Sequence, residues 1–157
     1  MVKRKGTAIP LITLRKPVTD DAWIYRLIQE ELIPLSHYEA ESLLKKDLSK
    51  RLSNGKTYVS RSEKGTCTGF IHVVSKKESY WVDMLAVRPR YQGKGIGQRL
   101  MRVAERLARR NGKDRMSLFV NSGNQEGIRF YQRNGYRIMH YEQSADCYLM
   151  EKKLKLI

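Results

Sequence analysis

The segment that decides the fold is Val87-Arg88-Pro89-Arg90-Tyr91-Gln92-Gly93-Lys94-Gly95-Ile96-Gly97. Before it, residues 80–87 are rich in β-branched and aromatic side chains, which is typical of a strand. After it, apolar side chains recur at helical spacing as far as Arg110, with Arg, Gln and Glu between them. The sequence therefore predicts a strand, a short glycine-rich loop and a helix, in that order.

The three glycines of this loop predict an anion site. Gly93, Gly95 and Gly97 alternate with other residues, so the backbone passes a ligand with little shielding by Cβ atoms. The loop amides and the unpaired N–H groups of the first helical turn can then point at one place. Amide dipoles and the helix macrodipole favour negative charge there, and a diphosphate is the natural occupant.

Glycine spacing excludes two commoner phosphate loops. The pattern G-x-G-x-x-G needs its third glycine one residue after Gly97, and G-x-x-x-x-G-K-[ST] does not occur in the chain. The segment instead resembles the acyl-CoA-binding motif [QR]-x-x-G-x-[GA] of the GNAT superfamily of N-acetyltransferases, matched by Gln92, Gly95 and Gly97. The alternative is a glycine-rich turn that only joins the strand to the helix.

A second stretch, residues 124–136, strengthens the resemblance. Asn124, Gly127, Ile128 and Tyr131 fall on one face of a predicted helix. The stretch is similar to the family segment N-x-x-A-x-x-x-Y-x-x-x-G-[FY], with Gly127 where alanine is usual. Glycine in place of alanine weakens a helix by about 1 kcal/mol.

The resemblance implies one GNAT-like N-acetyltransferase domain over residues 1–157. Its expected fold is α/β: a mixed, mostly antiparallel sheet of about six or seven strands with helices on both faces. Short links predict an antiparallel meander for the middle strands, whereas a helical crossover makes the strand at 115–121 parallel to the one at 80–87. Strand patterns cover residues 9–15, 57–62, 67–74, 80–87, 115–121, 136–141 and 147–154.

The family also implies acetyl-CoA as co-substrate, without a metal. Neighbouring parallel strands whose ends diverge open a slot, where a ligand arm pairs with backbone groups that otherwise lack partners. In the superfamily this splay separates the strands matching 80–87 and 115–121, so the pantetheine is expected there. The residues expected to hold the cofactor are Leu85, Ala86, Val87, Gln92, Gly93, Lys94, Gly95, Ile96, Gly97, Gln98, Asn124 and Tyr131.

Acetyl transfer to an amine needs an uncharged amine, a stabilised oxyanion and a protonated leaving thiolate. Tyr131 occupies the family position of the general acid, and Asp83, placed by strict alternation on the same face as Trp81 and Leu85, is the candidate base. The N–H of Leu85 is expected to polarise the thioester carbonyl. The alternatives are a core tyrosine, a substrate-orienting carboxylate and, for Asn124, a helix N-cap.

The expected acceptor is a primary amine of a small molecule, peptide or protein. A capping-box pattern at 36–39 begins a second helix, and in the family the connection between the first two helices borders the acceptor. His37, Tyr38 and Trp81 are therefore candidate substrate-binding residues. An exposed histidine beside a helix cap is the simpler alternative for His37.

The net charge of +15, from 31 Lys plus Arg against 16 Asp plus Glu, favours anionic partners. Coenzyme A accounts for few of these charges. The surplus indicates either a solvated basic surface with no partner, or nucleic acid, ribosomes or an acidic substrate. The alternative function is a basic nucleic-acid- or ribosome-binding module that keeps a CoA pocket without turnover. The same field disfavours polycationic amines at long range, although a local acidic pocket can overcome it.

The two cysteines, Cys67 and Cys147, lie far apart, so neither a disulfide framework nor a metal-ligand spacing is visible. A reducing, cytoplasmic location is expected, and a dimer is plausible. No apolar run approaches the length of a membrane span, and the basic N-terminal stretch lacks the features of a signal peptide.

Overall fold

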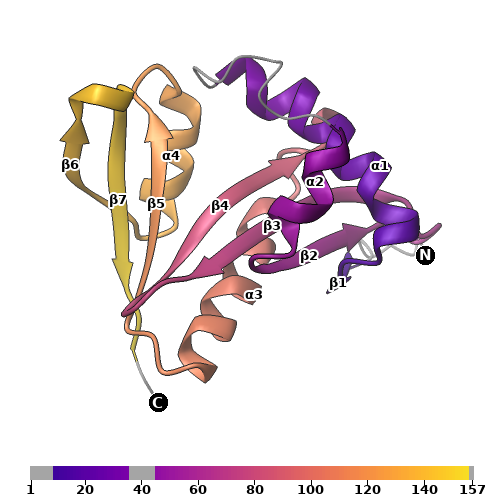
Figure 1. The fold of residues 1–157 in the computed structure, drawn as a ribbon, viewed down its shortest axis with the longest axis horizontal. Coiled ribbons are helices and arrows are strands. Elements are labelled where there is room, and N and C mark those ends of the chain that lie inside the picture. The colour runs from indigo at the N-terminus through magenta and orange to yellow at the C-terminus, as the bar shows by residue number, and fades with distance from the viewer. Residues whose placement is uncertain (1–8, 36–44, 156–157) are drawn as a thin grey trace, which may run out of the picture.

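The computed structural model describes residues 9–35 and 45–155. Their seven strands are β1 (Leu11–Leu14), β2 (Lys56–Arg61), β3 (Cys67–Ser75), β4 (Ser79–Val87), β5 (Arg115–Asn121), β6 (Arg137–Glu142) and β7 (Cys147–Lys153). They form one sheet in the order β1-β2-β3-β4-β5-β7-β6, in which β4 and β5 are parallel and every other neighbouring pair is antiparallel. The predicted fold class is confirmed (Figure 1).

Helices cover both faces of this sheet. They are α1 (Pro17–Leu27), which continues as the π-helical turn η1 (Ile28–Leu32) and the 3-10 turn η2 (Ile33–Leu35), then α2 (Lys45–Leu52), α3 (Ile96–Arg110) and α4 (Gln125–Arg133). Figure 1 shows α1 and α2 on one face and α3 on the other. In residues 9–35 and 45–155, no helix has the length and apolar character needed to cross a bilayer. The predicted capping box, with His37 and Tyr38, lies outside the described residues.

Two apolar clusters hold the helices against the sheet. On the α3 face, Leu100 packs with sheet residues that include Leu118. On the other face, Ile24 of α1 and Leu48 of α2 pack with Phe70 of β3. Full burial of such a side chain contributes about 1.5–3 kcal/mol, so each cluster fixes its helices firmly on the sheet.

A β-bulge interrupts β4 at Asp83. The register pairs His72 with Met84 and Val73 with Val82, which leaves Asp83 as the extra residue of β4. A bulge breaks the simple alternation of side chains along a strand. The strand therefore changes the face that its even-numbered residues present, at the point where the candidate base lies.

The bulge corrects the predicted placement of Leu85. Before it, Tyr80 and Val82 belong to the cluster on the α3 face, whereas beyond it Ala86 belongs to the cluster under α1 and α2. Leu85 packs against the α3-side cluster. Strict alternation had put Leu85 on the face of Asp83 and was wrong, because the extra residue reverses the alternation.

The splay between β4 and β5 is confirmed. Pairing runs from Ser79 with Arg115 to Val82 with Leu118 and then stops. Both strands continue, β4 to Val87 and β5 onward past the last pair, and their ends diverge in Figure 1. The far half of β4 therefore has no strand on its β5 side.

Candidate active site

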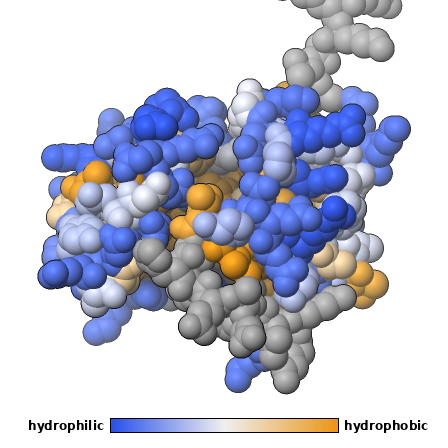
Figure 2. All heavy atoms as spheres, turned by 90° about the horizontal axis from the view of Figure 1, so that it is seen from above, coloured by the Kyte–Doolittle hydropathy of each residue, from blue (hydrophilic) through white to orange (hydrophobic). Residues whose placement is uncertain are grey.

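The diverging strands open a cavity of about 1430 Å³. Viewed from above in Figure 2, apolar side chains lie between two largely polar flanks. The cavity runs from the glycine loop to the side chains before the bulge, so it connects the two ends of the predicted site. It is lined by the predicted residues Trp81, Asp83, Leu85, Ala86, Val87, Gln92, Gly93, Gly95, Ile96, Gly97, Gln98, Asn124 and Tyr131. Lys94 does not line it; its ammonium lies 5.7 Å from the ring centroid of Tyr91.

Two loop glycines adopt backbone conformations that side chains disfavour. Gly93 has φ of 74° and Gly95 has φ of 81°, both in the left-handed region. A Cβ added to Gly95 meets no atom of the described chain within 4 Å, so the space above it is open. Gly95 is also the N-cap of α3, which directs the first N–H groups of that helix into this region.

Contacts on both sides hold the loop in place. The Nε2 amide of Gln92 donates a hydrogen bond of 2.8 Å to the carbonyl of Val87, which ties the loop to the end of β4. A Cβ on Gly97 would lie 3.2 Å from Cζ of Phe130. Gly97 therefore lets α3 pack closely against α4, and its role differs from that of Gly95.

Leu85 and Val87 present their backbone polar groups to the slot. The N–H of Arg88 donates to the carbonyl of Thr68 on β3 at 2.8 Å. Along an antiparallel strand, residues that bond to one neighbour alternate with residues that face the other side. Residues 85 and 87 thus face the side from which β5 has diverged. A ligand amide can pair there with the backbone of Leu85 and with the N–H of Val87, whose carbonyl already accepts from Gln92.

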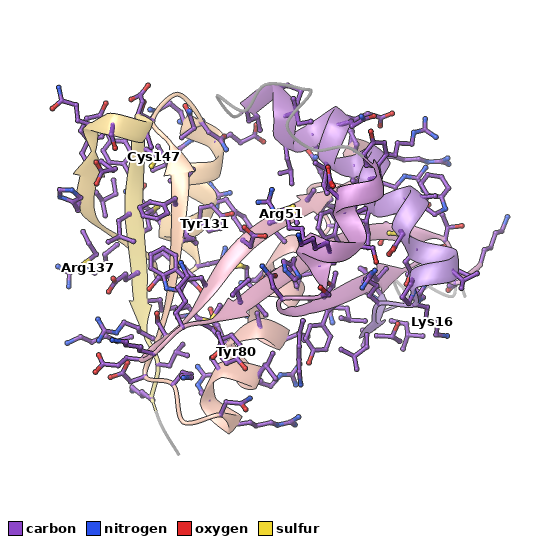
Figure 3. All side chains as sticks on the ribbon, in the orientation of Figure 1. Lys16, Arg51, Tyr80, Tyr131, Arg137 and Cys147 are labelled. Atoms are coloured by element: carbon purple, nitrogen blue, oxygen red, sulfur yellow. The ribbon has the colours of Figure 1, made fainter. Side chains whose placement is uncertain are left out.

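Tyr131 lies on α4 beside the slot, across the diverging strands from Arg51 (Figure 3). Its ring makes edge contacts with Phe130 at 5.2 Å and Tyr136 at 6.0 Å between centroids. Burial raises the pKa of the Tyr131 phenol to about 12. The hydroxyl therefore keeps its proton at neutral pH and has one to donate.

Asn124 caps α4. Its Oδ1 accepts a hydrogen bond of 3.0 Å from the N–H of Gly127. A Cβ on Gly127 would lie 2.4 Å from Nδ2 of Asn124, so the cap in this rotamer requires glycine. The departure from the family's alanine thus has a local reason, and Asn124 both caps the helix and lines the cavity.

Asp83 projects from the bulge into the cavity, where Arg51 of α2 holds it. The Nε and Nη2 groups of Arg51 donate to its two carboxylate oxygens at 3.2 and 3.0 Å. Such a two-point pair fixes the orientation of the carboxylate. Arg51 and its neighbour Asn54 both line the cavity, and the sequence patterns did not single them out.

His72 of β3 lies next to the carboxylate of Asp83. It is fully buried, its Nδ1 lies 2.8 Å from Oγ1 of Thr57, and its Nε2 lies 3.1 Å from Oδ1 of Asn54 and 3.9 Å from Oδ2 of Asp83. Burial lowers the pKa of His72, against the opposing pull of Asp83. No motif pointed to His72, because its partners lie on two other segments, residues 54–57 and β4.

The end of the cavity before the bulge is largely apolar. Its walls include Trp81 and Phe119 from the sheet, whose rings lie 5.1 Å apart. Leu32 and Ile33 from the turns after α1 also line the cavity. Trp81 thus stands where an acceptor was expected. Phe119 was not predicted, because no motif includes it and its exposure on β5 is visible only in the structure.

The described residues contain no group of three or more His, Cys, Asp or Glu side chains that could hold a metal ion. Cys147 lines the cavity and Cys67 is buried away from it. Burial raises the pKa of the Cys67 thiol to about 11, so this cysteine stays protonated and unreactive at neutral pH.

The loop, the splay and the helix order define the class of this protein. Residues 22–136 match the Acetyltransferase (GNAT) family, which is most of the chain. The chain therefore belongs to the GNAT family and is an acyltransferase that uses acetyl-CoA.

Its relatives include proteins with different acceptors. The chain is 27% identical over 116 residues, 74% of its length, to the spermidine N(1)-acetyltransferase of Thermoplasma acidophilum, of which it covers 71%. It is also 27% identical over 154 residues, 90% of its length, to the aminoalkylphosphonate N-acetyltransferase of Salmonella typhimurium, of which it covers 95%.

A solved structure shows the same fold. The paia N-acetyltransferase of Thermoplasma acidophilum, in complex with coenzyme A, superimposes with a TM-score of 0.75 at 22% identity, over 91% of this chain and 99% of that one. At this identity the likeness concerns the fold alone.

Proposed function

We propose that the protein transfers the acetyl group of acetyl-CoA to a primary amine, by direct attack of the amine nitrogen on the thioester. One observation carries the proposal. The pairing of β4 and β5 stops at Val82 and Leu118, and the cavity opened there is lined by the glycine loop at one end, by Tyr131 beside it and by Asp83 at the bulge.

The cofactor is proposed to enter on the side of α3 and α4. Its diphosphate lies over Gly93 and Gly95, where the N-terminus of α3 and the open space above the loop suit an anion. Its pantetheine amides pair with the backbone of Leu85 and Val87 on the side that β5 has left. Asn124 lies at the start of α4, on the same cavity.

The proposed chemistry uses three groups of the chain. Asp83 takes the proton of the acceptor ammonium, and the N–H of Leu85 donates to the carbonyl oxygen of the thioester. The amine nitrogen then bonds to the acetyl carbon, and the carbon–sulfur bond breaks as this intermediate collapses. The nitrogen gives up its second proton in the same collapse, and that proton restores the phenol of Tyr131. Tyr131 gives its phenolic proton to the departing thiolate.

The acceptor is proposed to reach Asp83 from the face of α1 and α2. The two relatives act, by name, on spermidine and on aminoalkylphosphonates, so the family resemblance alone leaves both cationic and anionic amines open. The net charge of +15 favours the anionic kind at long range.

The test is amine-dependent release of coenzyme A. Purified protein, acetyl-CoA and a library of primary amines are combined, free thiol is measured, and mass spectrometry identifies the acetylated amine. We expect thiol release that requires an amine and produces its N-acetyl derivative in equal amount. Release of thiol at the same rate with and without every amine would reject the proposal.

A further inference from the structure

Two aromatic side chains form a platform at the acceptor end of the cavity. We call Trp81 and Phe119 the aromatic shelf; their ring centroids lie 5.1 Å apart with the planes tilted by 36°. Phe119 is 53% exposed, although its neighbours Leu118 and Val120 are buried in the α3-side cluster. A large apolar ring left open at the edge of a cavity is a candidate contact for a ligand.

The shelf lies on the acceptor side of the sheet. Leu118 and Val120 point toward α3, so Phe119 between them points to the opposite face. Trp81 alternates with Tyr80 and Val82 in the same way. The glycine loop and the start of α4 belong to the other face. The shelf therefore lies on the opposite side of the sheet from the proposed diphosphate site.

The shelf also stands beside the proposed base. Trp81 alternates with Tyr80 and Val82 and so points away from α3. The contact of Asp83 with Arg51 places Asp83 on the face of α2, so the two side chains share one face. Both line the one cavity. An acceptor whose amine reaches Asp83 therefore has its next few atoms over the shelf.

A cation stands over the shelf. The Nζ atom of Lys76 lies 4.5 Å from the ring centroid of Trp81, and Lys76 is among the residues that line the cavity. Among the described residues, no carboxylate lies within 4.0 Å of this ammonium. Asp83, which lines the same cavity, pairs with Arg51 instead. An anionic group on a ligand that rests on the shelf would therefore meet Lys76 without displacing a carboxylate of the protein.

We propose that the acceptor is a primary amine with a planar apolar body and one anionic group. The body packs on Phe119 and Trp81, the anionic group contacts Lys76, and the amine faces Asp83. This inference rests on the proposed function and adds the substrate class to it. Free amino acids with aromatic side chains and short peptides that begin with one share this chemistry.

Four small amines separate the two parts of this inference. Phenylalanine carries ring and carboxylate; phenethylamine lacks the carboxylate, alanine lacks the ring, and ethylamine lacks both. We expect the ring to raise kcat/KM by about tenfold through contact with the shelf. The carboxylate is expected to add about threefold, since an ion pair at an exposed rim is weak.

Two variants assign each effect to its residue. Phe119→Ala should remove most of the ring effect and leave the carboxylate effect, whereas Lys76→Ala should do the reverse. Ile138→Ala, an exposed apolar residue outside the cavity, and Lys77→Ala, the neighbouring lysine outside it, are the matched controls and should change neither. Thermal unfolding verifies that the variants are folded.

The outcomes distinguish this inference from the function on which it rests. The substrate class would be overturned if spermidine were acetylated faster than phenylalanine. It would also be overturned if Phe119→Ala kept the ring effect and Lys76→Ala kept the carboxylate effect. N-acetyl transfer would stand in either case. Thiol release that needs no amine would overturn both. A peptide beginning with phenylalanine, preferred over the free amino acid with the same dependence on Phe119, would support the class and identify its source as a peptide.

Discussion

Tyr131 supplies the proton that the departing thiolate needs in the proposed mechanism. Because burial raises the pKa of its phenol to about 12, the hydroxyl is fully protonated throughout the neutral range. Tyr131→Phe keeps the ring contacts with Phe130 and Tyr136 and removes only the hydroxyl group. We expect kcat to fall by about 100-fold, the lower range for loss of a general acid.

The cofactor should bind the Tyr131→Phe variant nearly as well as the parent, which isothermal titration with acetyl-CoA measures. Tyr148→Phe is the control, because Tyr148 packs against the same cluster without lining the cavity. Unchanged kcat at saturating acceptor in Tyr131→Phe would remove this residue from the mechanism.

Asp83 differs from a free carboxylate because Arg51 contacts both of its oxygens. If Asp83 is the base, its carboxylate must accept a proton although it is hydrogen-bonded to Arg51. We expect Asp83→Asn to lower kcat/KM for an ordinary primary amine by about 100-fold. The loss should shrink for an acceptor whose amine is already uncharged at the assay pH, because that acceptor needs no deprotonation before it attacks.

Steady-state kinetics with both kinds of acceptor decide between a base and an orienting group. Glu30→Gln, which changes an exposed carboxylate outside this cavity, is the control. Equal losses for the two acceptors would show that Asp83 orients the substrate without taking its proton.

At the scale of elements, two glycines allow the cost of backbone strain to be measured separately from the loss of ligand contact in the loop between β4 and α3. Gly95 and Gly112 have φ of 81° and 70°, and a Cβ on either meets no atom of the described chain within 4 Å. Gly95→Ala and Gly112→Ala should therefore cost similar stability, about 1–2 kcal/mol. Only Gly95 lies on the cavity, so only its Cβ intrudes on the proposed diphosphate site.

Acetyl-CoA affinity should weaken by about tenfold or more in Gly95→Ala, since a methyl group blocks close approach of the backbone to the ligand. Gly112→Ala should bind like the parent. Titration calorimetry and denaturant unfolding measure the two quantities separately. Equal affinities in the two variants would refute the placement of the diphosphate over this loop.

The elements themselves were predictable because their signals are local. The alternating residues of β5 and the helical spacing after the glycine loop each lie within one segment, and β5 has the predicted bounds. The slot between β4 and β5 followed from the family resemblance, since a helical crossover determines only that the two strands are parallel.

The rest of the site depends on contacts between segments far apart in the chain. The bulge at Asp83 arises because β4 has one more residue than β3 between two consecutive pairs of the ladder. Neither strand shows this when its sequence is considered alone. Arg51, His72 and Phe119 likewise acquire their roles only when the sheet brings α2, β3 and β5 to one cavity. Alternation along β4 therefore predicted the face of Trp81 correctly and that of Leu85 wrongly.

At the scale of the whole molecule, α1 must hold its position, because the turns that follow it line the cavity. A buried ion pair attaches this helix to β2. Asp20 is 1% exposed and receives hydrogen bonds of 2.8 and 2.6 Å from Arg61 and one of 2.6 Å from the N–H of Lys16. Loss of Arg61 would leave a carboxylate in the interior without its cation.

Arg61→Met should therefore lower the free energy of unfolding by about 3–5 kcal/mol near neutral pH. Arg26→Met is the control, because the pair of Arg26 with Glu30 is exposed and should be worth less than about 1 kcal/mol. Urea unfolding followed by circular dichroism measures both. Similar losses in the two variants would mean that the buried pair does not anchor α1.

The pH dependence of this loss tests its electrostatic origin. Burial alone would raise the pKa of Asp20, but hydrogen bonds from Arg61 and the N–H of Lys16 bring it below 3.8 in the parent. The parent therefore keeps this stabilisation above that pH and loses it only as the pH falls through the lower folded pKa. In Arg61→Met burial dominates, the folded pKa of Asp20 rises above the unfolded value, and acid stabilises the variant relative to the parent. The difference between them should thus shrink between about pH 7 and pH 4, whereas a constant difference would assign it to lost packing of the Arg61 side chain.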